Sequence, residues 1–454
     1  MFVVTLPKSA AKNPAGYAKR AKKEGADILE IRSDLTPRIG AFNSVLPLLV
    51  SIRDKNVGLI EKLQPEYIDI EDIHQKLPEN DAKIILSFHN YKKTVSLHEV
   101  KKIAQKMCSK KPWMIKIATM VNDYEDLKVL TELQEFLRSM KIRATILGMG
   151  PKASLIRVLS PYKNFWTYAC LDKKETSAPG QFPMSFYRLT SGKKNPKVFG
   201  ILGGPQVSES LSPVIQNVLF HHHNVNAIYT AFPAEDFAKS WKTLTELGVS
   251  GFSVTAPFKK EVLSHITHID PLVAEISSSN TVLKTKDGWI GCNTDVTGIM
   301  EGYPFLKECR EVAVIGSGGV VPAVLSAIST LNPETFITVF ARSTENVLPL
   351  TRRFDIDIAP LKALEKGVFD ALVCCISEDV PLTLPKALTG AVAIDLRYGK
   401  NTEFLKAAKR KKYQTLNGLP MLVCQALKQF ELFTGKKPTA TDAKSLLLLL
   451  SSSS

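Results

Sequence analysis

The chain has 454 residues and a formal net charge of +15 at pH 7, a length that suggests two or three domains. Its hydrophobic content of 44% and charged content of 23% exclude a wholly disordered chain. The longest purely apolar candidate for a membrane span, Leu446–Leu450, is far shorter than the ~20 residues that a transmembrane helix needs.

The seven cysteines show no metal-ligand spacing, so we expect reduced thiols and no metal site. The first residues contain no basic segment followed by an apolar one, and we therefore expect a cytoplasmic location. The positive charge is spread thinly and accompanies no nucleic-acid-binding motif. It favours a solvated surface that attracts small acidic ligands over a nucleic-acid partner.

The first half of the chain has eight short apolar runs, most of them separated by helix-like segments. They lie at Phe2–Leu6, Ile28–Ile31, Val50–Ile52, Tyr67–Ile70, Ile84–Ser87, Met114–Ile117, Arg143–Leu147 and Phe165–Ala169. This alternation predicts an α/β fold of the (β/α)₈ TIM type, with short loops because the segment is short for that fold. Polar residues at the ends of several runs would then meet at one end of the barrel.

Lys116 lies in an apolar run, and His89 ends another. Burial favours the uncharged, nucleophilic form of a lysine, and a histidine can transfer protons near neutrality. Taken singly, neither residue indicates catalysis. Lys116 could be a lysine at a strand edge whose amine reaches solvent, and His89 could be a histidine that only makes structural hydrogen bonds. Glu30 and Arg32 share one face of their strand, since alternate residues point the same way.

Together these motifs resemble type I 3-dehydroquinate dehydratases, which dehydrate through a Schiff base. The resemblance covers about residues 1–190 and includes Ser177-Ala-Pro-Gly-Gln181. It implies that Lys116 forms an imine with the substrate ketone and that His89 transfers protons. The residues implied to bind substrate or order the site are Glu30, Arg32, Arg53, Arg157, Ser177 and Gln181.

Two positions depart from this family. Ile156 stands where a serine usually precedes the carboxylate-binding arginine. Val57 stands where a glutamate usually orients the catalytic histidine. Another carboxylate, Asp54 or Glu71, could substitute; without one, His89 would be less well aligned and turnover slower.

In the second half, Val312–Ile315 reads as a strand that runs into the glycine turn Gly316-Ser-Gly-Gly319. Such a turn lets the backbone approach a pyrophosphate, and the following helix N-terminus favours the anion. The next strand ends at Arg342 and Ser343 without an acidic residue for a free ribose hydroxyl, which favours NADP over NAD. Further strands are expected at Val198–Leu202, Ala227–Ala231, Gly251–Thr255, Thr335–Phe340, Ala371–Cys375 and Val392–Leu396.

Motifs around these strands resemble shikimate dehydrogenases over about residues 197–440. They include Ser253-Val-Thr-Ala-Pro-Phe-Lys259 and Gly291-Cys-Asn-Thr-Asp295. The resemblance implies a catalytic pair, Lys259 and Asp295. It implies substrate contacts from Ser210, Ser212, Thr255, Asn280, Tyr398 and Gln425, and contacts to an NADP cofactor from Gly316, Ser317, Gly318, Gly319, Arg342, Ser343 and Gly418.

The two resemblances imply consecutive reactions, since 3-dehydroshikimate is the product of the first family and the substrate of the second. We expect a barrel over 1–190, a linker over 191–197, a substrate-binding domain over 198–305, a Rossmann-like NADP-binding domain over 306–416, returning helices over 417–445 and a frayed tail over 446–454. The small-molecule substrates expected are 3-dehydroquinate, 3-dehydroshikimate and shikimate. Three alternatives remain at this point: a regulatory protein without catalysis, an NAD-using quinate dehydrogenase and a nucleic-acid binder.

Overall fold

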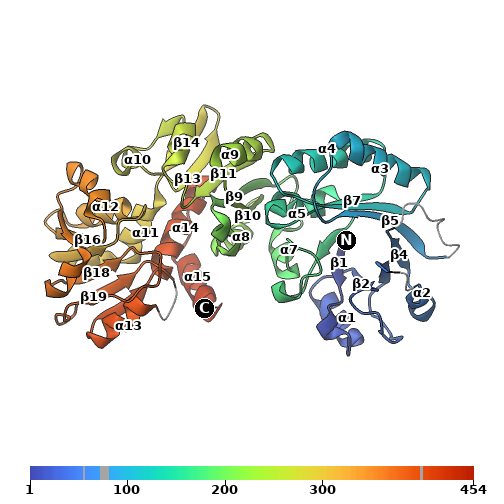
Figure 1. The fold of residues 1–454 in the computed structure, drawn as a ribbon, viewed down its shortest axis with the longest axis horizontal. Coiled ribbons are helices and arrows are strands. Elements are labelled where there is room, and N and C mark those ends of the chain that lie inside the picture. The colour runs from blue at the N-terminus through green and yellow to red at the C-terminus, as the bar shows by residue number, and fades with distance from the viewer. Residues whose placement is uncertain (55–56, 72–80, 399–401, 454) are drawn as a thin grey trace. The chain divides into compact units, whose positions relative to one another are not determined.

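The structure, a computed structural model, describes residues 1–54, 57–71, 81–398 and 402–453. The chain forms two compact units (Figure 1). The first comprises Met1–Gly200 and Pro205–Val249, and the second comprises Ile201–Gly204 and Ser250–Ser454. No helix of the described residues is long and apolar enough to cross a membrane.

Eight parallel strands form the core of the first unit and hydrogen-bond in the order β7-β6-β5-β4-β3-β2-β1-β8. Their bounds are β1 (Phe2–Thr5), β2 (Ile28–Arg32), β3 (Leu48–Ile52), β4 (Tyr67–Ile70), β5 (Lys83–Asn90), β6 (Met114–Met120), β7 (Ala144–Met149) and β8 (Thr167–Ala169). Each expected apolar run contributes to one of them. The predicted TIM-type fold is confirmed as a nearly closed barrel.

The seam between β7 and β8 lies outside the regular strand ladder. The amide of Phe165 donates to the carbonyl of Ala144 at 2.9 Å. The side chain of Thr145 exchanges hydrogen bonds with the backbone of Trp166 at 3.1 and 3.3 Å. A threonine hydroxyl thus links the two strands where their backbones no longer pair regularly.

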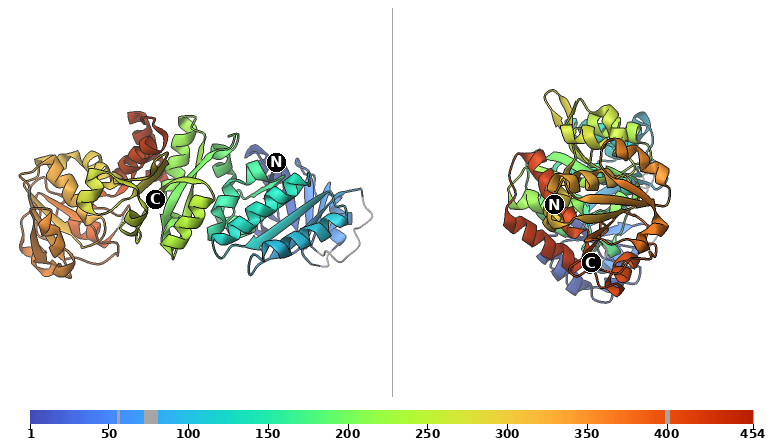
Figure 2. Two further views of the ribbon diagram at one scale, coloured as in Figure 1. Left: turned by 90° about the horizontal axis from the view of Figure 1, so that it is seen from above. Right: turned by 90° about the vertical axis from the view of Figure 1, so that its left-hand side faces the viewer.

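Amphipathic helices cover the barrel. They are α1 (Pro14–Lys23), α2 (Gly58–Leu63), α3 (Leu97–Ser109), α4 (Glu125–Ser139), α5 (Ser154–Val158), α6 (Ser160–Lys163) and α7 (Met184–Thr190). The blue-green helices α3 and α4 run along the strands in Figure 2. Residues 33–47, between β2 and β3, contain no helix, so this connection lacks the helix that usually separates two barrel strands.

The first unit continues beyond the barrel into α8 (Ser212–His222), β10 (Ala227–Pro233) and α9 (Phe237–Glu246), with the start of β9 (Lys197–Gly203). Tyr124 on the barrel donates its hydroxyl to the carbonyl of Pro233 at 2.9 Å. Ser154 donates to the carbonyl of Ala231 at 2.6 Å. The barrel and these elements therefore belong to one compact unit and are joined by hydrogen bonds.

The second unit begins with a small sheet. Strand β11 (Val249–Val254) pairs antiparallel with β13 (Thr281–Thr285), and β13 pairs antiparallel with β14 (Gly288–Cys292). The short β12 (His268–Ile269) lies parallel to β14. Helices α10 (Pro271–Ile276) and α11 (Thr294–Gly302) belong to the same region.

The second sheet of this unit is wholly parallel, with the order β17-β16-β15-β18-β19-β20. Its strands are β15 (Glu311–Ile315), β16 (Phe336–Ala341), β17 (Asp357–Pro360), β18 (Ala371–Cys374), β19 (Val392–Asp395) and β20 (Gln414–Asn417). In chain order this is 3-2-1-4-5-6, the order of dinucleotide-binding sheets. The expected Rossmann-like domain is confirmed, with helices α12 (Val321–Leu331) and α13 (Glu403–Arg410) beside the sheet (Figure 1).

The chain ends in helices α14 (Leu419–Thr434) and α15 (Ala440–Ser453). The expectation of a frayed tail is wrong. Leu446 and Leu450 lie four residues apart on one face of α15, and both are buried. The repeated leucines and serines of this segment gave no helical pattern in the sequence, but the structure places them in a helix that buries one face.

Candidate active sites

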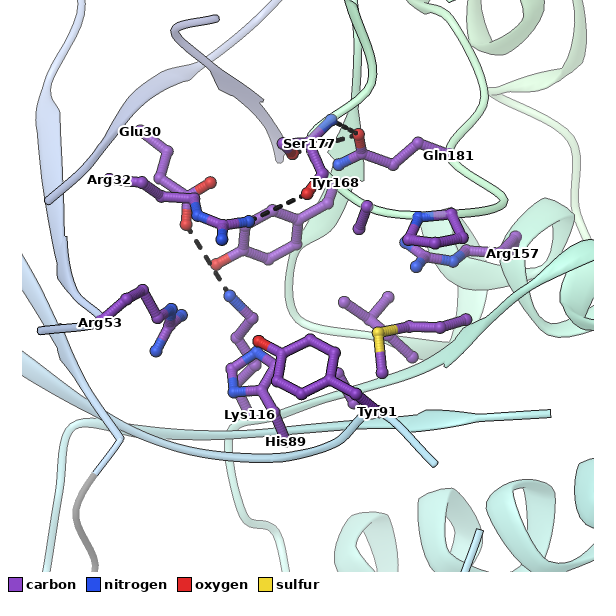
Figure 3. A pocket seen from close by; sticks show the side chains of 15 residues that line it. Glu30, Arg32, Arg53, His89, Tyr91, Lys116, Arg157, Tyr168, Ser177 and Gln181 are labelled. Atoms are coloured by element: carbon purple, nitrogen blue, oxygen red, sulfur yellow. Dashed lines mark hydrogen bonds and ion pairs between the residues drawn. The ribbon is translucent and has the colours of Figure 1, made fainter. Parts of the chain in front are cut away.

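Side chains from several barrel strands converge on one cavity of about 80 Å³ (Figure 3). All eight barrel residues proposed from the sequence line it. They are Glu30, Arg32, Arg53, His89, Lys116, Arg157, Ser177 and Gln181. Tyr91 and Tyr168 also line it and were missed by the sequence analysis. The convergence follows from the barrel, because parallel strands place their carboxyl ends at one rim.

The amine of Lys116 is buried among acidic and aromatic groups. Its Nζ lies 3.0 Å from Oδ2 of Asp69 and 3.8 Å from Oε1 of Glu30. The ring centroid of Tyr168 lies 4.1 Å from the same nitrogen. The amine is therefore held in place by fixed negative charge and faces the cavity (Figure 3).

Asp69 connects the charged groups of this site, and sequence reasoning missed it. It is fully buried on β4, pairs with Arg53 at 2.7 Å and accepts a hydrogen bond from Ser87 at 2.5 Å. Burial alone would raise the pKa of its carboxyl, but the charges of Arg53 and Lys116 hold that pKa far below its usual range. An acid within the apolar run Tyr67–Ile70 was the available signal.

His89 has an acidic neighbour despite Val57. Oε1 of Glu71 lies 3.0 Å from Nδ1 of His89, although without the alignment of a hydrogen bond. Burial lowers the pKa of His89, as does the positive charge of Lys116, while Glu71 opposes the shift. Val57 itself is exposed at the start of α2. Glu71, one of the two substitutes considered, thus contacts the imidazole.

Arg157 is a buried cation with an unused donor. Its Nε donates to the carbonyl of Gly148 at 2.6 Å, whereas its Nη1 is buried with no hydrogen-bond partner. Burial lowers the pKa of this guanidinium to about 10. A buried donor without a partner at the edge of a cavity is suited to bind an anionic ligand group.

The loop after β8 closes another side of the cavity. Arg32 donates from Nη1 to the carbonyl oxygen of Ser177 at 2.9 Å. Oε1 of Gln181 accepts from the amide of Ser177 at 3.0 Å. The motif that the sequence analysis found distinctive is thus a loop fixed by its own side chains and by β2.

The second proposed site centres on a lysine–aspartate pair. Lys259 follows β11, and Asp295 lies in the first turn of α11. Their Nζ and Oδ2 atoms are 2.6 Å apart. Asn280 donates to the other carboxylate oxygen of Asp295 at 2.8 Å, so both oxygens of this carboxylate have a partner and its orientation is fixed.

Other residues proposed to bind substrate differ in their surroundings. Gln425, on α14, lies 3.4 Å from the hydroxyl of Thr294, next to Asp295. Thr255 is partly buried just after β11, and Tyr398 is exposed after β19. Ser210 and Ser212 belong to the first unit, where the amide of Ser212 donates to the hydroxyl of Ser210 at 3.2 Å.

The glycine turn after β15 has the geometry of a nucleotide-binding loop. Gly316 has a φ of +127°, and a Cβ there would lie 3.2 Å from the carbonyl carbon of Cys375. Gly316, Ser317 and Gly318 line a cavity of about 440 Å³ with Arg342 and Ser343. Backbone amides, a hydroxyl and a guanidinium form a donor set that fits a phosphorylated dinucleotide.

Two glycines proposed for cofactor binding do not line this cavity. Gly319 is the last residue of the glycine turn, two residues before α12 begins. Gly418 precedes α14, and a Cβ there would lie 2.0 Å from the carbonyl oxygen of Leu396. Close backbone packing therefore explains the glycine at 418.

Three family models match the chain. The type I 3-dehydroquinase model matches residues 57–188. The shikimate dehydrogenase substrate-binding domain matches residues 202–282, and the shikimate 5′-dehydrogenase C-terminal domain matches residues 418–445. The matches follow the order expected from the motifs.

Individual relatives match one or both of these parts of the chain. The NADP(+) shikimate dehydrogenase of Syntrophobacter fumaroxidans is 32% identical over 52% of this chain and 86% of its own. A chloroplastic bifunctional 3-dehydroquinate dehydratase/shikimate dehydrogenase of Arabidopsis thaliana is 27% identical over 92% of this chain and 79% of its own. The solved shikimate dehydrogenase of Aquifex aeolicus has a TM-score of 0.50 and 28% identity, and the match covers 56% of this chain and 98% of that one. The chain belongs to the bifunctional 3-dehydroquinate dehydratase/shikimate dehydrogenase family, in which a type I 3-dehydroquinase domain precedes a shikimate dehydrogenase.

Proposed function

We propose that this chain converts 3-dehydroquinate to 3-dehydroshikimate and then reduces that product to shikimate with NADPH, in the cytoplasm. The buried amine of Lys116, held by Asp69 and Glu30 beside His89, is the observation that carries the first step. The Lys259–Asp295 pair carries the second step.

In the first step, Lys116 attacks the substrate ketone and water leaves as the imine forms. The imine withdraws electrons, so His89 can remove a proton from the adjacent carbon. His89 then returns that proton to the departing hydroxyl, which leaves as water, and hydrolysis of the imine frees Lys116. Glu71 keeps the imidazole oriented during both transfers.

Arg157 binds the substrate carboxylate in this proposal. Its unpartnered Nη1 supports the assignment, because a carboxylate would satisfy a donor that the protein leaves unused. Glu30, Arg32, Arg53, Ser177 and Gln181 hold the hydroxyl groups or order the site.

In the second step, Lys259 donates a proton to the carbonyl oxygen that becomes the hydroxyl, and Asp295 positions the lysine. Bound NADPH supplies the hydride. The turn at Gly316, Ser317 and Gly318 would hold the pyrophosphate, and Arg342 and Ser343 the 2′-phosphate. Ser210, Ser212, Thr255, Asn280, Tyr398 and Gln425 would bind the substrate.

Borohydride trapping tests the first assignment. With 3-dehydroquinate present, reduction of the imine should inactivate the dehydratase and add the ligand mass to the peptide that contains Lys116. Lys116→Arg is the matched control and should gain no mass. A wild-type protein that turns over without any trapped adduct would contradict the Schiff base.

A further inference from the structure

The cofactor cavity contains an acid as well as a base. Arg342 at the end of β16 and Glu378 after β18 are the charged residues among those that line it. Nη2 of Arg342 lies 3.5 Å from Oε2 of Glu378. The two side chains are 71% and 64% exposed, so water and ligands compete with their attraction. Both groups are therefore available to a bound nucleotide.

These two charges act oppositely on the adenosine ribose. A 2′-phosphate carries up to two negative charges, so Arg342 attracts it and Glu378 repels it. A free ribose 2′-hydroxyl, in contrast, can donate a hydrogen bond to a carboxylate, as in NAD-binding sheets. In those sheets the acid follows the second strand, whereas here that position is Arg342 and the acid comes from the loop after β18.

We propose that Glu378 determines cofactor specificity by weakening recognition of the 2′-phosphate and accepting a hydrogen bond from an unphosphorylated ribose. This rests on the proposed cofactor site. The consequence is a narrower preference for NADPH over NADH than Arg342 alone would give, so the dehydrogenase uses both dinucleotides.

The test compares Glu378→Gln with wild type by calorimetric titration of adenosine 2′,5′-bisphosphate and of AMP. Removing the repulsive charge should tighten the bisphosphate about fivefold at low salt, and less at high salt. Binding of AMP should weaken, because a neutral amide is a poorer acceptor for the ribose hydroxyl than a carboxylate. The matched control is Glu345→Gln, which removes an exposed acid from the segment after β16 that does not line the cavity. The ratio of kcat/KM for NADPH to that for NADH should rise in parallel in Glu378→Gln only.

Unchanged affinity for the bisphosphate in Glu378→Gln would overturn the proposal, as would equal tightening in Glu345→Gln. A wild-type protein that binds neither nucleotide would instead contradict the cofactor site itself, so the two failures are distinguishable.

Discussion

The two proposed catalytic lysines have very different surroundings. The side chain of Lys116 is 6% exposed and faces two carboxylates, whereas that of Lys259 is 18% exposed and pairs with Asp295. Asp69 in turn pairs with a second cation, Arg53. The lysine proposed to form a covalent bond to substrate lies in a dense, balanced set of charges. The lysine proposed to transfer a proton pairs with one carboxylate and is more accessible to solvent.

Removing each lysine in turn should have the largest effects and should affect a different activity in each case. Lys116→Ala should lower dehydratase kcat by at least about 10³-fold, because no other group replaces the nucleophile. Lys259→Ala should lower dehydrogenase kcat by about 10²–10⁴-fold, the usual value of a general acid. Separate assays with 3-dehydroquinate and 3-dehydroshikimate measure the two effects. Each variant should keep the other activity, and loss of both in either variant would contradict independent sites.

Removing the carboxylate that pairs with each lysine should destabilise the protein more at the barrel site than at the second site. Asp69→Asn leaves Arg53 and Lys116 buried with unbalanced charge and should cost about 3–5 kcal/mol of unfolding free energy. Asp295→Asn should cost about 1 kcal/mol, because solvent reaches Lys259. Urea unfolding measures both, with the exposed Asp123→Asn as a control that should cost least. Equal losses of unfolding free energy in Asp69→Asn and Asp295→Asn would show that the denser charge network contributes no more to stability than the single ion pair.

The dehydratase should respond to pH through Glu71. Burial lowers the pKa of His89, and the carboxylate of Glu71 partly restores it. Glu71→Gln removes that support, so the pKa of His89 should fall further. Because the unprotonated imidazole is the base, the acid limb of the kcat profile should then move to lower pH. The maximum kcat should also fall about tenfold from poorer alignment.

A pH profile of dehydratase kcat checks this, with Glu61→Gln on the exposed face of α2 as the control. An acid limb that stays in place in Glu71→Gln would mean that Glu71 does not act on His89. The dehydrogenase profile should be the same in all three proteins.

The smallest expected effect concerns Tyr91. Its ring stacks on His89 with centroids 5.7 Å apart and an interplanar angle of 10°. Tyr91→Phe keeps the stack and should leave kcat nearly unchanged. Tyr91→Ala frees the imidazole and should lower dehydratase kcat about threefold, since such contacts contribute about 0.5–1.5 kcal/mol. Equal kcat losses in the two variants would assign the effect to the hydroxyl instead.

The sequence predicted the main strands because buried parallel strands are short, continuous apolar runs. It missed β13 and β14, which are partly exposed and include polar residues such as Lys284 and Thr285. It also misjudged α15, where burial of Leu446 and Leu450 outweighs the repetitive composition. The local sequence pattern does not show which face of such a helix or strand is buried against the rest of the protein.

The sequence predicted those residues of the barrel site that belong to recognisable motifs, and it missed residues outside them. Asp69 was missed because one acid in an apolar strand gains meaning only when Arg53 and Lys116 are seen beside it. Glu71 was one of two carboxylates that the sequence offered as a partner for His89, and its contact with His89 depends on the fold. It follows a different strand from His89, and only the barrel brings the two within 3.0 Å.

The most direct test of the account is NADPH oxidation by the purified chain with 3-dehydroquinate as the only substrate. We predict that NADPH is consumed, and that Lys116→Ala or Lys259→Ala each abolishes its consumption. Addition of 3-dehydroshikimate should restore consumption in Lys116→Ala but not in Lys259→Ala. If wild-type protein consumes NADPH with neither compound, the two-step account is wrong and the chain is a non-catalytic member of its family.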